Sequence, residues 1–295
     1  MTQQTTKAND IELCFETLGD PSNPTLLLVM GFTAQMTVWP IEFCHALADH
    51  GFHIIRFDNR DVGLSTKTDG QPPDAIALMA KAQAGETIER DDVPYTLSDM
   101  ADDAIGLLDA LSVDSAHVVG ASMGGMIAQH LAVEHPERLR SATSIMSTTG
   151  ESSVGQPTDE AIGALLTPAP TDREANIARG VANSQIISGP LWNEADARAR
   201  AVESYDRMFY PEGSPFQLAA ILASGDRTRG LEAVEVPFQV IHGAVDSLID
   251  VSGGYATAAA VPGADLLVLA AMGHDMPLLL WPQIIGAITG IAARG

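Results

Sequence analysis

Short apolar runs alternate with helical patterns through the first half of this 295-residue chain. Apolar runs of about five residues are typical of strands that are buried on both faces of a parallel sheet. Helices between them let consecutive strands lie parallel, so the sequence predicts an α/β fold built on a mostly parallel twisted sheet. The expected strands are residues 11–17, 25–29, 53–57, 116–119, 142–146, 238–242 and 265–269, and the expected helices are residues 41–50, 98–111, 123–134 and a helix from Pro282 onward.

Strand signals disappear between Ser147 and Val236, where amphipathic helical patterns take over. Asn193 and Ser214 are expected as N-caps, with Pro215 at the first position of its helix. We therefore expect residues 148–235 to form a helical cap inserted into a core domain of residues 1–147 and 236–295. A long insertion of this kind favours a lid that covers substrate, and a structural extension of the sheet is the alternative.

The segment Gly120-Ala121-Ser122-Met123-Gly124 fits the pattern Gly-x-Ser-x-Gly, with an apolar strand before it and a helical pattern after it. A serine on such a sharp turn takes a strained backbone conformation, which only small neighbours allow. The helix behind it offers free N–H groups where an oxyanion develops. The pattern predicts that Ser122 is a nucleophile; the alternative is an ordinary glycine-rich turn.

A serine hydroxyl needs an adjacent base, and the base needs an acid that orients it. With a serine on such a turn, the acid and then the histidine follow along the chain. Asp246 follows the expected strand 238–242, and His274 follows the strand 265–269. The other seven histidines all precede Asp246, which makes His274 the expected base. Asp250 is the reserve candidate for the acid, whereas the side chain of Asp275, next to the base, should point elsewhere.

Four motifs carry a family resemblance: Val29-Met30-Gly31-Phe32, the segment Phe57-Asp58-Asn59-Arg60-Asp61-Val62-Gly63-Leu64-Ser65, the turn at Ser122, and the loops of Asp246 and His274. On these motifs the chain resembles serine hydrolases of the α/β-hydrolase superfamily over essentially its whole length. The resemblance implies an oxyanion hole made by the backbone N–H groups of Phe32 and Met123.

One position departs from the pattern, because the family usually has His-Gly where this chain has Met30-Gly31. In this respect the chain resembles the branch that holds anthracycline methylesterases and related bacterial esterases, although no anthracycline substrate follows from that. The Asp58–Ser65 segment is expected to be structural, ordered by charge-assisted bonds between Arg60 and its acids. The alternative, a metal site, has no recognised ligand set there.

These residues predict a carboxylesterase-like serine hydrolase that works through an acyl-enzyme, without a cofactor or metal. The same residues are compatible with a thioesterase, lactonase, carbon–carbon hydrolase, perhydrolase or acyltransferase. A non-catalytic small-molecule binding protein on the same fold is the alternative from another class. Serine at the turn argues against dehalogenase and epoxide hydrolase chemistry, which in this family uses an aspartate there.

Several large apolar side chains are candidates for an adaptable substrate pocket, with the hydrophobic core as the alternative place for them. They are Met36, Trp39, Met208, Phe209, Met272 and Met276, together with Met123. Such a pocket, in a chain with this charge, favours a neutral and apolar ester as the small-molecule substrate.

Composition excludes several classes of function. With 16 basic and 38 acidic residues, the formal charge of −22 disfavours binding to nucleic acid or to anionic membranes. The two cysteines, Cys14 and Cys44, are too few for a disulfide framework and are expected as buried thiols. The polar N-terminus lacks a secretory signal, so a cytoplasmic location is expected. The uncharged stretch 276–293 is expected as a buried terminal helix and not as a membrane span. The sequence leaves the oligomeric state open.

Overall fold

A computed structural model describes residues 2–295, which contain an eight-stranded sheet in the order β1-β2-β4-β3-β5-β6-β7-β8. β2 is antiparallel to both β1 and β4, and the other neighbours are parallel. The strands are β1 (Gln4–Ala8), β2 (Ile11–Leu18), β3 (Thr25–Val29), β4 (His53–Phe57), β5 (Ala116–Ala121), β6 (Leu139–Ile145), β7 (Phe238–Gly243) and β8 (Asp265–Leu269). The predicted α/β fold is confirmed.

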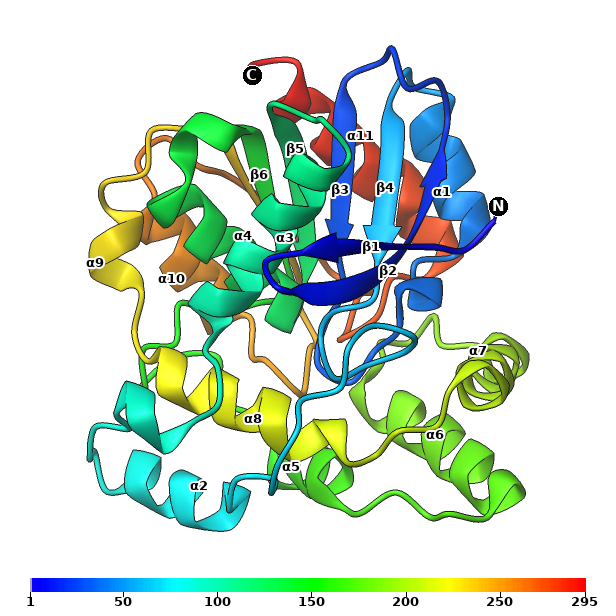
Figure 1. Cartoon of the computed structure of the whole chain (residues 1–295), viewed down its shortest axis with the longest axis vertical. Coiled ribbons are helices and arrows are strands. Elements are labelled where there is room, and N and C mark those ends of the chain that lie inside the picture. Colours follow the sequence, from blue (N-terminus) through cyan, green and yellow to red (C-terminus); the bar gives the residue numbers. More distant parts are fainter. Residues whose placement is uncertain (1) are drawn as a thin grey trace.

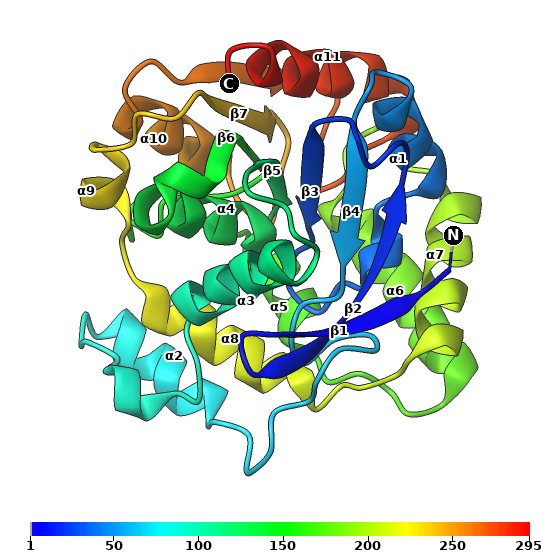
Figure 2. The same ribbon diagram turned by 45° about the horizontal axis from the view of Figure 1, so that its top comes forward.

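Helices cover both faces of the sheet, as the fully buried strands β3, β4 and β5 require. One face carries α1 (Ile41–Ala48) and α11 (Trp281–Ala292), and the other carries α3 (Leu97–Ala110), α4 (Met123–Glu134) and α10 (Ser252–Ala260), as Figure 2 shows. The expected terminal helix is confirmed as α11, which buries an isoleucine stripe. Within residues 2–295, no helix has the length and apolar character that crossing a bilayer would need.

The parallel strands end at one edge of the sheet. Val29 in β3 pairs with Gly120 in β5, and Ile145 in β6 pairs with Ile241 in β7. The loops that follow these strands therefore meet at the same place, where open parallel sheets form their sites. In Figure 1 the arrows of β3 and β4 point toward this edge, and a layer of helices lies beyond it.

All helices between β6 and β7 come from the segment in which strand signals are absent. They are α5 (Asp159–Leu166), α6 (Arg173–Ile187), α7 (Glu194–Arg207), α8 (Gly213–Ser224) and α9 (Thr228–Leu231). In Figure 1, α5 to α8 form the layer at the strand ends, while α9 lies beside α10. The division into a core and a cap of residues 148–235 stays a prediction about folding units.

Asn193 is the N-cap of α7, as predicted, and its side chain accepts a hydrogen bond from Asp196 N. The prediction for α8 was wrong. This helix begins at Gly213 after Glu212, so Ser214 lies inside it and Pro215 is its third residue.

Three elements were not expected from the sequence: the polar edge strand β1, the helix α2 (Ala75–Gln83) and the helix α10. Leu78 of α2 packs with Ile88 and Val93 against Ala219 of α8, which adds an outer layer to the helices at the strand ends. Short 3₁₀ turns complete the chain: η1 (Met36–Val38), η2 (Arg90–Asp92), η3 (Pro136–Arg138) and η4 (Leu278–Leu280). Pro136 begins η3 directly after α4 has ended, as expected for a helix stop.

Candidate active site

Ser122 lies on a sharp turn between β5 and α4, with φ of 57° and ψ of −120°. This left-handed backbone costs energy for a residue other than glycine, so the surroundings must hold it. They leave no room for larger neighbours: a Cβ added at Gly120 would lie 1.9 Å from Gly124 O, and one at Gly124 would lie 2.1 Å from Val29 O. The glycines of the pattern are thus explained by close packing of the turn.

The three residues predicted as nucleophile, base and acid are in continuous contact. His274 Nε2 is 2.9 Å from Ser122 Oγ, and His274 Nδ1 is 2.8 Å from Asp246 Oδ2. The Asp246 side chain is fully buried and that of His274 is 7% exposed. Because an ionised carboxylate only accepts hydrogen bonds, we assign the proton of the neutral ring to Nδ1. Nε2 is then free to accept the serine proton.

The loop after β3 passes directly over the serine. A Cβ added at Gly31 would lie 3.0 Å from Ser122 Cβ and 3.1 Å from Ala121 O. Asn59 Nδ2 donates to Met30 O at 2.8 Å and fixes the start of this loop. Within residues 2–295, no backbone carbonyl accepts a hydrogen bond from the amide of Phe32 or of Met123. The described residues thus give neither amide a backbone hydrogen-bond partner.

Comparison with known proteins assigns this chain to a family. The sequence pattern of the alpha/beta hydrolase fold family matches residues 24–279. The chain belongs to this family. As an α/β hydrolase with esterase relatives, it is a hydrolase, and the resemblance inferred from its motifs is confirmed.

Two curated relatives and one solved structure illustrate the similarity. The α/β hydrolase is 28% identical over 304 residues to rhodomycin D methylesterase DauP from Streptomyces sp. (strain C5), covering 95% of this chain and 94% of that protein. It is 30% identical over 206 residues to 2-hydroxymuconate semialdehyde hydrolase from Pseudomonas sp. (strain CF600), covering 65% of each. The enol-lactonase structure from Burkholderia xenovorans LB400 matches with a TM-score of 0.75 at 19% identity, covering 98% of this chain and 100% of that one. The last similarity concerns the fold alone.

Asp246 is held by its own loop. Its Oδ1 accepts from the amides of Leu248 and Ile249, both at 2.9 Å, which leaves Oδ2 for His274. His242, at the end of β7, donates from Nε2 to Ile249 O at 2.8 Å and lies 3.6 Å from Asp246 Oδ2. Burial lowers the pKa of His242, which favours a neutral ring beside the acid.

The two other acids near this site bind backbone N–H groups. Asp250 Oδ1 accepts from Ser252 N at 3.0 Å. Asp275 Oδ1 accepts from Gly273 N at 3.0 Å and from Gly189 N at 3.2 Å. Among the described residues, the acid in hydrogen-bond contact with the His274 ring is Asp246 and neither of these.

The candidate pocket residues divide into two groups. Met36, Trp39 and Met272 are 0% exposed, as is Met123, and Trp39 stacks on Phe43 with ring centroids 5.9 Å apart. A side chain without accessible surface lines no open cavity, so the structure places these residues in the core. Met208, Phe209 and Met276 are partly exposed. Phe209 stacks on Tyr205 of α7 at 4.9 Å.

Arg60 makes a charge-assisted pair, but its partner is not, as predicted from the sequence, one of the acids of the Asp58–Ser65 segment. The Arg60 guanidinium donates to both carboxylate oxygens of Asp103 in α3, each at 2.6 Å. In the part of the chain that the structure describes, no group of three or more histidines, cysteines or acids is arranged to hold a metal ion. The two cysteines are buried and free, as expected.

Sequence analysis missed three side chains around the loop over Ser122: Asn59, Arg207 and Gln217. Asn59 could have been noticed within its motif. Arg207 and Gln217 could not, because they lie in helical sequence about 150 residues or more from the groups they bind.

Proposed function

We propose that this α/β hydrolase is a serine carboxylesterase in which Ser122 is the nucleophile, His274 the general base and acid, and Asp246 the residue that orients the imidazole. The observation that carries this proposal is the unbroken line of hydrogen bonds from Ser122 Oγ through His274 to Asp246 Oδ2. A nucleophile, a base and an orienting acid in this order are the groups that acyl transfer requires.

In the proposed reaction, Ser122 Oγ attacks the ester carbonyl carbon while its proton moves to His274 Nε2. The backbone N–H groups of Phe32 and Met123 donate to the oxyanion of the tetrahedral intermediate. Collapse of the intermediate breaks the bond to the alcohol, which leaves with the proton from His274. Water then gives its proton to His274 and attacks the acyl carbon, and the carboxylic acid leaves as Ser122 is reprotonated.

The proposed substrate is a neutral, apolar small-molecule ester with a small alcohol group. Similarity along nearly the whole chain to a rhodomycin D methylesterase supports a methyl ester as the first choice. The formal charge of −22 disfavours anionic substrates.

The test is hydrolysis of p-nitrophenyl esters from acetyl to decanoyl, and of the matching methyl esters, by the wild type, Ser122→Ala and the control Ser152→Ala. Ser152 is exposed, and it is not among the hydrogen-bond partners of the three proposed catalytic side chains in the described residues. We expect Ser122→Ala to lose at least about 10³-fold in kcat/KM, since the nucleophile is removed, while Ser152→Ala keeps wild-type activity. A fluorophosphonate should label the wild type at Ser122, as read by mass spectrometry.

An active Ser122→Ala variant would show that the site is wrongly assigned. If the wild-type protein is labelled by the fluorophosphonate but cleaves no ester, the assignment of Ser122 as the nucleophile stands and the assignment of esters as substrates is wrong. Thioesters, lactones and acyl acceptors other than water would then be assayed.

A further inference from the structure

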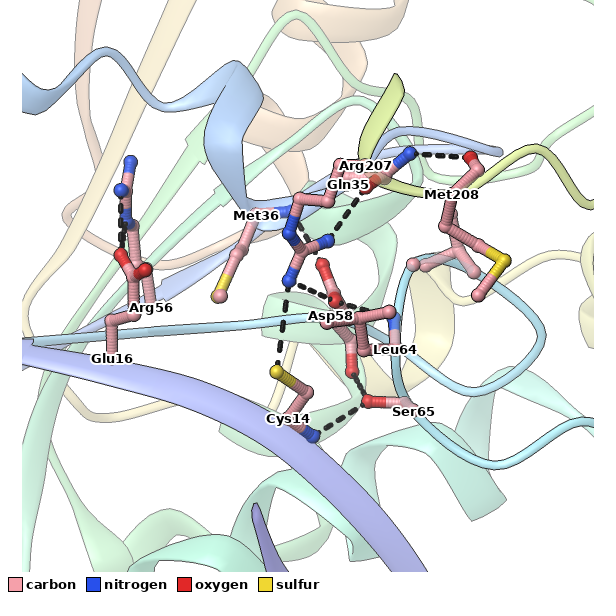
Figure 3. A network of polar contacts seen from close by, with 12 residues as sticks. Cys14, Glu16, Gln35, Met36, Arg56, Asp58, Leu64, Ser65, Arg207 and Met208 are labelled. Atoms are coloured by element: carbon pink, nitrogen blue, oxygen red, sulfur yellow. Dashed lines mark hydrogen bonds and ion pairs between the residues drawn. The ribbon is translucent and has the colours of Figure 1, made fainter. Parts of the chain in front are cut away.

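A buried ion pair joins the end of α7 to the loops at the strand ends. Arg207 Nη2 donates to Asp58 Oδ2 at 2.7 Å, with the two side chains 9% and 0% exposed. Asp58 also accepts from the backbone N–H of Met36, at 2.8 Å to Oδ1, and from that of Leu64, at 2.8 Å to Oδ2. Figure 3 shows Arg207 pointing into the centre of this network. The Asp58 carboxylate thus binds the loop after β3, the loop after β4 and the last residue of α7.

Gln35 connects the same helix to the loop that passes over Ser122. Its Nε2 donates to Ser204 O at 2.7 Å and to Met208 O at 2.9 Å, and its Oε1 accepts from Arg207 Nη1 at 2.6 Å. Ser204 O also accepts from the backbone N–H of Met208 at 3.2 Å, so Gln35 adds a second hydrogen bond to this carbonyl at the C-terminus of α7. The segment from Gly31 to η1 is therefore tied to α7 at Gln35 and, through Asp58, at Met36.

A second helix at the strand ends, α8, also binds the loop after β3, at Thr33. Gln217 of α8 is fully buried, and its Oε1 accepts from Thr33 N at 2.8 Å. Its Nε2 donates to Arg60 O at 2.8 Å. Thr33 has φ of +56°, an unfavourable conformation for a β-branched residue, so this bond helps to hold a strained backbone. Thr33 directly follows Phe32, whose amide is proposed to bind the oxyanion.

We infer that Gln217 and Arg207 are positioning residues for the oxyanion hole. Stabilisation of the transition state then depends on the hydrogen bonds that hold α7 and α8 against the loop after β3. The inference rests on the proposed function. The physical reason is geometric: the donor has to lie about 3 Å from the place where the oxyanion forms, and the loop that carries it is held by helices outside the sheet. Gln217 and Arg207 act through the loop and do not contact the substrate.

The first test variant is Gln217→Met, which keeps the length of the side chain and removes both of its hydrogen bonds. The second is Arg207→Lys, which keeps the charge but lacks the two guanidinium nitrogens that bind Gln35 and Asp58 at the same time. The control is Arg294→Met, because Arg294 makes an exposed ion pair with Asp265 of β8 and, among the described residues, no bond to α7, α8 or the loop. Rates are divided by the fraction of molecules that a fluorophosphonate titrates. Inhibition constants are measured for a trifluoromethyl ketone, whose adduct with the serine mimics the tetrahedral intermediate.

We expect kcat to fall by about tenfold to hundredfold in Gln217→Met and by a smaller factor in Arg207→Lys, with KM within about threefold of wild type. The inhibition constant should rise in proportion to the loss in kcat/KM. This readout separates positioning from partial unfolding, because unfolded molecules lower the titrated fraction and leave the inhibition constant of the rest unchanged. Arg294→Met should match wild type.

Two failures can be told apart. If the wild type hydrolyses esters and both variants keep its kcat per titrated site and its inhibition constant, the positioning role is wrong and the esterase proposal stands. If the wild type is neither labelled nor active on esters, the proposed function fails, and the inference fails with it.

Discussion

At the scale of single residues, the site depends on how closely three stretches of backbone approach one another. The strained Ser122 lies where β5, α4 and the loop after β3 meet, and glycines at 31, 120 and 124 make this approach possible. The replacement of His by Met30 before the loop glycine does not alter this requirement. The glycine is needed for contact with the serine, and Asn59 holds the carbonyl of residue 30.

The first residue-scale prediction concerns Gly31→Ala. The added Cβ would lie 3.0 Å from Ser122 Cβ, so the loop carrying the Phe32 amide has to move by a few tenths of an ångström. We expect kcat per titrated site to fall by about tenfold to hundredfold, since oxyanion stabilisation is sensitive to donor position. Gly286→Ala is the control, because its Cβ would meet nothing within 4 Å. Wild-type kcat in Gly31→Ala would refute the placement of this loop in the reaction.

At the scale of elements, helices and strands with a strong apolar pattern could be predicted. Helices and strands whose bounds depend on contacts with distant parts of the chain could not. The strands β3, β4 and β8 and the helix α4 have their predicted bounds, because apolar residues predominate in each strand and a helical pattern runs through α4. β1 is polar and mostly exposed, so it depends on pairing with β2. The start of α8 was wrongly predicted at Ser214, since contact with a loop 150 residues earlier in the chain outweighs the local capping signal.

That contact gives the element-scale prediction. A Cβ added at Gly213 would lie 2.0 Å from Asp61 O, so Gly213→Ala must push the first turn of α8 away from the loop. We expect the free energy of unfolding to fall by about 1–3 kcal/mol, and kcat to fall with it because Gln217 lies one turn further along the same helix. Urea unfolding and titrated kinetics measure both. Gly163→Ala in α5 is the control, since its Cβ meets nothing. A destabilised variant with unchanged kcat would contradict the link between α8 and the loop.

At the scale of the whole molecule, the chain combines a formal charge of −22 with histidines that folding buries. Burial lowers the pKa of His53, His117 and His242, and that of His117 falls to about 4. The unfolded chain binds protons on these rings below about pH 6.5, which the folded state does not bind until lower pH. Their stabilising contribution is thus fully present above pH 6.5 and is lost as the pH falls toward 4.

The corresponding prediction concerns His117→Asn, in which an amide replaces the ring nitrogen that lies 2.9 Å from Ser141 Oγ. Urea unfolding at pH 7, 6 and 5 should show that the wild type loses about 2 kcal/mol more stability over this range than the variant does. His50→Asn, at an exposed helix end, should follow the wild type. Parallel pH curves for the wild type and His117→Asn would show that His117 does not titrate as burial implies.

The sequence alone determined the class of fold and the candidates for nucleophile, base and acid. This was possible because strand and helix patterns are local, and because Ser122, Asp246 and His274 each follow an apolar strand whose end lies at the site. The tertiary structure alone decided which residues surround those groups. Met36, Trp39 and Met272, candidates for the pocket, lie in the core, while Arg207 and Gln217, unmarked in the sequence, hold the loop over the serine. The physical reason is that burial and long-range hydrogen bonds depend on how the helices pack against the strand ends, and packing between segments so far apart leaves no local pattern.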